Sequence, residues 1–263
     1  MIIHQYLPLK PWMEPRTRRL PGLFPVGLQD WLACDEVYDQ QIQLRDRLIS
    51  EKRDQVYQTG KDTDPHKHPA AIELLACLTK ELSAKKSYQL TPPNIKRPDG
   101  AMINCTSDDP LIIAARLVQE DLLILEEKNR QHYLTNAVLC FPASWTLAQK
   151  IDKPLGAIHE PVTNYTDKIT GRVNLIFDHL RPEQPLLRAN FLLYDDPALH
   201  QPRLENQKKT IDPKAPLYVR VERQTLRRLP KTRAIVFAVH TYLVREDSLT
   251  DNERTTLRAA IQS

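Results

Sequence analysis

Glycine is scarce in this sequence, and its six copies are scattered. No two of them form a phosphate-cradling pattern, so neither a dinucleotide-binding fingerprint nor a P-loop is present. The four cysteines stand far apart with no CxxC pair, which argues against a zinc ribbon or an iron–sulfur cluster. Any redox chemistry therefore needs electrons from a partner that carries the nicotinamide and iron–sulfur machinery.

Long apolar runs are missing as well, since none approaches the roughly 20 residues of a membrane span. Lys10, Glu14 and the basic cluster at 16–19 interrupt the N-terminal segment where a signal peptide needs an apolar core. We therefore expect a cytoplasmic protein with no membrane partner. With 37 basic and 33 acidic residues, the net charge is only +4, whereas a nucleic-acid binder concentrates its positive charge.

The composition that remains is that of a globular chain. At 263 residues, with 41% apolar and 27% charged residues, one large domain or two small ones are allowed. Prolines gather in residues 1–27, which we expect to lie as an extended arm over a core. Residues 28–263 are expected to form a single domain.

Helical patterns dominate the first half of the chain. Apolar residues share a face between 29 and 58, with Arg45 interrupting that face. The clearest pattern starts with Asp109 as N-cap and Pro110 in the first turn, and it repeats through Leu125. Residues 84–107 read as a loop. We expect this helical half to wrap the sheet formed by the second half.

The second half changes to a period of two. It predicts strands over 132–142, 186–194, 217–226 and 234–244, before a final helix over 250–261. Consecutive strands without intervening helices pair antiparallel. The expected fold class is therefore α+β, a curved antiparallel sheet with helices on one face.

A single histidine, His159, stands in the segment LGAIHEPV, where Gly156 and Pro161 constrain the backbone on either side. Neutral imidazole is a common ligand of haem iron and other metals. A lone histidine cannot hold zinc by itself. The alternative is a turn histidine bonded to a backbone carbonyl.

Polar residues alternate along the predicted strand at 217–226. Arg220, Glu222 and Gln224 share one of its faces, and Arg188 and Asn190 share a face of the strand before it. Two such strands side by side can line a cavity for a charged ligand, because arginine suits haem propionates or a substrate carboxylate. The alternative is a solvent-facing sheet surface with cross-strand ion pairs.

The run from Arg223 to Arg233 is the most basic in the chain. Nucleic-acid binding needs interleaved aromatic residues or a recognition helix, and the run has neither. A solvated turn between two strands, or a docking patch for an acidic partner, fits it better.

The runs LCFPASW, KPLGAIHEPVTNY, LLRAN and YVRVERQTLRRLPKTRAIVF resemble the haem-dependent oxidative N-demethylase family, in its haem-bearing alpha subunit. Weaker similarity in GLFPVGLQDWLACDEVYDQQIQLRDRL extends the resemblance over most of residues 20–245. It implies a PAS-like fold that binds haem b and an oxygen-dependent reaction. In that reaction a small secondary amine such as dimethylamine loses a methyl group as formaldehyde. NADPH, FMN and an iron–sulfur cluster would then reside on partner reductase subunits.

The resemblance also implies roles for individual residues. His159 falls in its IHEPV block and would be the axial ligand of the haem iron. Asn190, Arg220 and Arg223 fall in blocks that would serve the haem, and Glu222 would hold a protonated amine. Two alternatives remain open at this point. One is a haem or small-molecule sensor module without turnover, and the other is a docking domain that uses the basic run.

Overall fold

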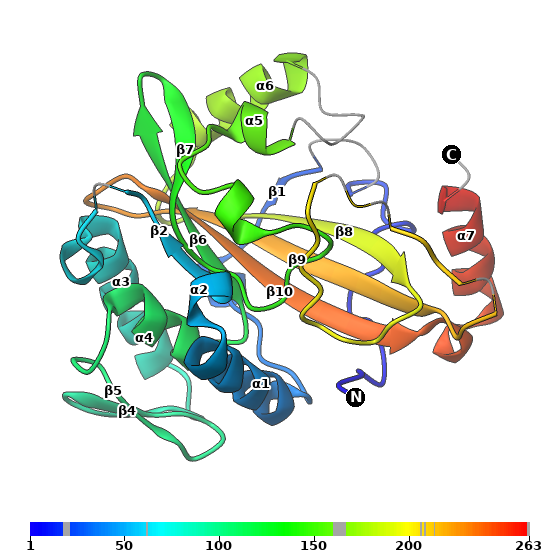
Figure 1. Ribbon diagram of the computed structural model, residues 1–263, viewed down its shortest axis with the longest axis horizontal. Coiled ribbons are helices and arrows are strands. Elements are labelled where there is room, and N and C mark those ends of the chain that lie inside the picture. The colour runs from blue at the N-terminus through cyan, green and yellow to red at the C-terminus, as the bar shows by residue number, and fades with distance from the viewer. Residues whose placement is uncertain are drawn as a thin grey trace.

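The computed structural model describes residues 1–17, 22–61, 63–159, 167–205, 207, 209–212 and 214–261 (Figure 1). Its main feature is an antiparallel sheet of seven strands in the order β1-β8-β9-β10-β6-β7-β2. These strands are β1 (Phe24–Pro25), β8 (Leu186–Tyr194), β9 (Tyr218–Arg228), β10 (Ile235–Arg245), β6 (Asp121–Lys128), β7 (Gln131–Val138) and β2 (Tyr57–Thr59). The predicted α+β class is confirmed.

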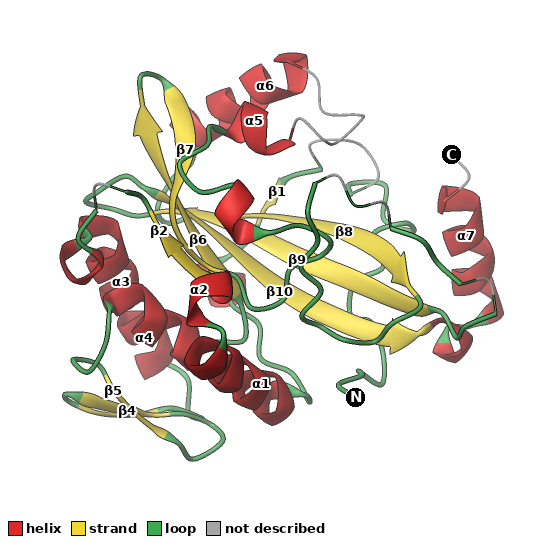
Figure 2. Cartoon of the chain, in the orientation of Figure 1, coloured by secondary structure: helices red, strands yellow, loops and turns green. Residues whose placement is uncertain are grey.

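A small second sheet and several helices complete the described elements (Figure 2). The small sheet contains β3 (Gln89–Thr91), β4 (Asn94–Lys96) and β5 (Met102–Asn104). The α-helices are α1 (Tyr38–Glu51), α2 (Arg53–Val56), α3 (Pro69–Ser83), α4 (Pro110–Leu117), α5 (Leu155–His159), α6 (Asp167–His179) and α7 (Asp251–Ile261). The 3₁₀ turns are Leu28–Asp30, Pro65–Lys67, Leu147–Gln149 and Glu246–Ser248. Among the described helices, none combines the length and the apolar character that crossing a bilayer requires.

Helices cover both faces of the large sheet, so the expectation of helices on one face was wrong. Val236 and Ala238 of β10 belong to the core that includes α3 and α4. Ile235 of β10 instead packs with Phe177 of α6 in a second core. The reason is the apolar character of both sides of the central strands, because alternate residues of a strand point to opposite faces and each apolar face must be covered.

The predicted long helix from Asp109 is two elements. Asp109 does cap α4, accepting a hydrogen bond from the Leu111 amide at 3.2 Å, but the helix ends at Leu117. The next residues bind other parts of the backbone: Glu120 accepts from the Ala33 amide at 2.7 Å, and Asp121 from the Cys140 amide at 2.8 Å. These tertiary contacts replace a helical continuation, and Asp121 begins β6. The predicted loop at 84–107 likewise contains the small sheet.

The edge of β10 is protected where β6 no longer pairs with it. β6 pairs with β10 only from Ile235 to Val239. Beyond that point, Gln41 of α1 donates to the Thr241 carbonyl at 2.9 Å, and the His4 amide donates to the Leu243 carbonyl at 2.7 Å. The N-terminal segment thus satisfies an otherwise exposed strand edge.

Candidate functional site

A buried polar wall forms where β8 and β9 pair. Glu222 lies opposite Asn190 in the register, and Arg220 and Gln224 lie two residues to either side of Glu222. Only 1% of the Arg220 surface and 7% of the Glu222 surface is exposed. The alternative of a solvent-facing sheet surface was therefore wrong. Burying these groups is costly unless they are paired, so each partner matters.

Arg220 uses much of its guanidinium to hold loops against the sheet. It donates to the Leu199 carbonyl at 3.0 Å, to the Phe141 carbonyl and to the Thr241 hydroxyl at 3.4 Å. Its Nε is buried with no hydrogen-bond partner among the described residues. One terminal nitrogen lies 3.5 Å from Oε1 of Glu222. Arg220 therefore positions the segments after β7 and β8 and also sets the charge beside Glu222.

Glu222 and Asn190 together leave hydrogen-bond acceptor capacity on the wall. Oε2 of Glu222 accepts from the side-chain nitrogen Nε2 of Gln224 at 2.9 Å, while among the described residues Oε1 has the Arg220 contact at 3.5 Å. Oδ1 of Asn190 is buried and accepts no hydrogen bond within the described part of the chain. Buried acceptors without donors are uncommon in folded proteins and call for an explanation. A ligand with N–H donors would satisfy both residues.

Two basic side chains that the sequence did not predict as site residues, Arg203 and Lys209, lie beside this wall. Both belong to the long segment between β8 and β9. Nζ of Lys209 lies 3.2 Å from the centroid of the Tyr194 ring and donates to the Leu193 carbonyl. Burial, followed by the charges of Arg203 and Arg220, lowers the pKa of Lys209 to about 8. Nη1 of Arg203 is buried without a hydrogen-bond partner in the described residues. The segment has no periodic pattern, so its unusual length was the available sign that it has a functional role.

The structure does not bring every predicted site residue to the wall. Arg223 lies on the opposite face of β9, where it donates to the Trp31 carbonyl at 3.2 Å and to the Asp30 carbonyl. His159 is the last residue of α5, and its side chain lies outside the described part of the structure. Its role as a ligand stays a prediction.

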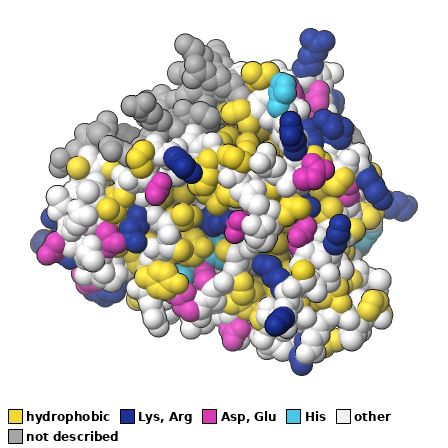
Figure 3. Space-filling view, turned by 180° about the vertical axis from the view of Figure 1, so that it is seen from behind, with side chains coloured by type: hydrophobic (Ala, Val, Ile, Leu, Met, Phe, Trp, Pro, Cys, Tyr) yellow, Lys and Arg dark blue, Asp and Glu magenta, His cyan; other side chains and the backbone are white. Residues whose placement is uncertain are grey.

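The basic run is largely interior, so the expectation of a solvated turn was wrong for most of its arginines. Arg227 stacks over the Trp31 ring at 4.3 Å, and Arg228 donates to the Phe177 and Arg233 carbonyls. Within the run from Arg223 to Arg233, only residues 230–233 are exposed. On the face drawn in Figure 3, basic and acidic side chains are interspersed. Neither observation supports docking through this run.

Comparison with known families gives one match that spans nearly the whole chain. A family model described as "Haem-dependent oxidative N-demethylase, alpha subunit-like" matches residues 22–263. The matched range contains the polar wall, α5 and the segment between β8 and β9.

Proposed function

This chain belongs to the haem-dependent oxidative N-demethylase alpha-subunit-like family, and we propose that it is the haem-binding subunit of an oxygen-dependent N-demethylase. The proposed substrate is a small secondary amine such as dimethylamine, which loses one methyl group as formaldehyde. We further propose that residues 28–263 form one PAS-like domain, that the cofactor is haem b, and that His159 is its axial ligand. The haem supplies the oxygen chemistry, while the protein supplies binding, orientation and electrostatics.

The side chains beside the wall fit a haem. Burial and the charges of Arg203 and Arg220 lower the pKa of Lys209, and Asp195 is the acid that opposes them. A group with two carboxylates, such as a haem with its propionates, would neutralise these basic side chains. The same sheet face continues into apolar residues that include Leu226 and Val239.

The single observation that carries the substrate assignment is the buried, unpaired Oδ1 of Asn190 directly opposite the Glu222 carboxylate. A protonated secondary amine has two N–H donors, one for each of these residues. The Glu222 carboxylate adds charge to its hydrogen bond, which roughly doubles the strength of such a bond. Holding the nitrogen in this way would fix the position of the methyl groups.

The reaction also requires a partner. Amine, O₂, two electrons and two protons give the demethylated amine, formaldehyde and water. The four cysteines are free thiols in separate positions. We propose that a cytoplasmic reductase with NADPH, FMN and an iron–sulfur cluster on its subunits delivers the electrons.

The test uses the purified chain supplied with hemin. We expect a Soret band, an altered band in the His159→Ala variant, and amine-dependent formaldehyde once a reductase is supplied. Glu222→Gln should lower kcat/KM for dimethylamine by about 10- to 100-fold, since a hydrogen bond to a charged group contributes roughly 1.5–3 kcal/mol. Glu51→Gln, on the exposed side of α1, is the matched control.

The outcomes separate the alternatives. A chain that stays colourless with hemin refutes the proposal entirely. A Soret band without amine-dependent formaldehyde would indicate a haem-binding module without turnover. Equal kcat/KM for the Glu222→Gln variant and the wild type would remove Glu222 from substrate binding.

A further inference from the structure

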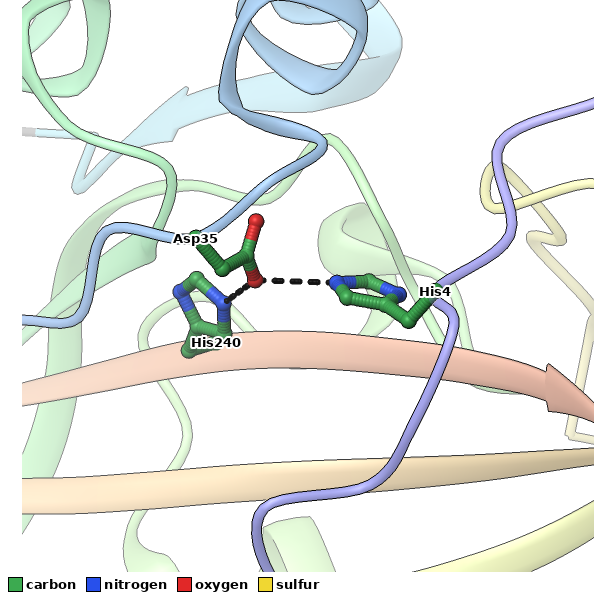
Figure 4. Close-up of side chains that lie close together, drawn as sticks. All are labelled: His4, Asp35 and His240. Carbon is green, nitrogen blue, oxygen red and sulfur yellow. Dashed lines mark hydrogen bonds and ion pairs between the residues drawn. The ribbon is translucent and has the colours of Figure 1, made fainter.

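Two histidines and an aspartate from distant parts of the sequence converge beside the edge of β10 (Figure 4). Nε2 of His4 and Nε2 of His240 lie 2.9 and 2.8 Å from the same oxygen, Oδ2 of Asp35. One ligand atom from each residue lies within 4.8 Å of the other two. Two imidazoles and one carboxylate form a known ligand set for divalent transition ions.

The groups around these residues hold them in orientations suited to a metal ion. The other oxygen of Asp35 accepts from the Gln119 side chain at 2.9 Å and from the Val37 amide at 3.1 Å. This leaves Oδ2 directed at the two imidazoles. Carboxylates that ligate metals are commonly fixed by such hydrogen bonds to their other oxygen.

His240 has the carboxylate neighbour that metal-bound histidines usually have. Its Nδ1 lies 3.4 Å from Oε1 of Glu120, and the Ala33 amide anchors that oxygen at 2.7 Å. Oε2 of Glu120 is fully buried and accepts no hydrogen bond in the described residues. A proton on Nδ1 leaves the Nε2 lone pair free for a metal ion. For His4, a proton on Nδ1 donated to the Leu243 carbonyl at 3.3 Å leaves Nε2 free in the same way, and this tautomer competes with the one in which the Leu243 amide donates to Nδ1 at 3.1 Å.

The local charge favours a bound cation. The carboxylates of Asp35 and Glu120 lie 2.8 and 3.4 Å from the two ring nitrogens of His240 and supply the negative charge. A cavity of about 430 Å³ adjoins the cluster and is lined by Asp35 and Tyr242 among others. The cavity therefore gives an ion access to the Asp35 side of the cluster.

We propose that His4, Asp35 and His240 bind one divalent first-row transition ion, with Zn²⁺ as the probe. The site is separate from the proposed haem site. His240 and the Glu222 wall lie on opposite faces of the sheet, because Glu222 pairs with Thr241, the next residue along β10. The ion would tie the N-terminal segment to β10 and to the loop before α1.

The experiment is Zn²⁺ titration of the chelator-treated full chain, with elemental analysis of zinc after dialysis. We expect one zinc per chain in the wild type and in His66→Gln, which changes an exposed histidine outside the cluster. His4→Gln and Asp35→Asn should lose stoichiometric zinc. Glu120→Gln should weaken zinc binding by about 10- to 100-fold, as changes in supporting residues of metal sites do.

The measurements distinguish zinc binding from metal brought by haem and from misfolding of a variant. Haem contributes iron and no zinc, so the result does not depend on the proposed catalytic function. His4 lies in the N-terminal segment, and far-UV circular dichroism checks that His4→Gln remains folded. Less than one zinc per wild-type chain, or full zinc retention in a folded His4→Gln variant, would overturn the proposal and leave an ion-pair network.

Discussion

The Arg45→Met variant is expected to destabilise this protein severely. Arg45 and Asp121 are both completely buried, and their side chains are joined by an Nη1–Oδ1 hydrogen bond of 2.8 Å. Arg45 also donates to the Gln119 carbonyl at 2.5 Å. Methionine keeps much of the side-chain volume but removes the charge. The substitution therefore leaves the Asp121 carboxylate buried without its counter-ion.

The magnitude follows from that uncompensated charge. Removing one partner of a buried ion pair costs about 3–5 kcal/mol. For a chain of this size each kcal/mol lowers the melting temperature by roughly 2–4 °C, so the expected drop is about 6–20 °C. Asp121→Asn should also be costly, because the carboxylate accepts from the Cys140 amide at 2.8 Å and the Phe141 amide at 3.0 Å. An asparagine side chain has one oxygen and cannot replace both acceptors.

Urea unfolding followed by circular dichroism measures the effect. Arg47→Met, two residues away on the exposed side of α1, is the matched control and should change the free energy of unfolding by less than about 0.5 kcal/mol. The double variant Arg45→Met/Asp121→Asn should lose about 0.5–3 kcal/mol less than the sum of the single variants. A cost below about 1 kcal/mol for Arg45→Met, or strict additivity, would refute the reasoning.

Three further predictions concern pH and the N-terminal segment. In chelator-treated protein, the pKa of His240 is raised from 6.5 to about 9, so its stabilising effect of roughly 3 kcal/mol is complete below pH 6.5 and lost as pH rises through 9. The free energy of unfolding of the His240→Gln variant, taken from unfolding curves at each pH, should change little across that range. A decline with pH parallel to that of the wild type would contradict this. Glu73 accepts hydrogen bonds from the backbone amides of Lys231 and Thr232, and its pKa is lowered. Glu73→Gln should therefore lower the free energy of unfolding by about 1–2 kcal/mol at neutral pH. The difference from the wild type should shrink as the pH falls through the carboxyl pKa. Trp12 is buried against Phe191, so Trp12→Ala should lower the free energy of unfolding by about 3–5 kcal/mol and speed tryptic cleavage of the N-terminal segment. An unchanged digestion rate would show that other contacts hold the segment.

The sequence by itself determined the three consecutive strands β8, β9 and β10, while β6 was predicted as part of a helix. β8 has the predicted bounds, and β9 and β10 differ from prediction by one or two residues. Strand alternation also placed Arg220, Glu222 and Gln224 on one face. These properties are local, since they depend on a period of two and on turn residues nearby.

Only the tertiary structure decided the end of α4, the burial of the polar wall and the partners of the basic run. A local pattern contains no information about Ala33 binding Glu120, or about Leu199 and Phe141 binding Arg220. The convergence of His4, Asp35 and His240 is of the same kind. Residues more than 200 positions apart become neighbours because the N-terminal segment satisfies the free edge of β10, and the sequence around each of them gives no sign of the others.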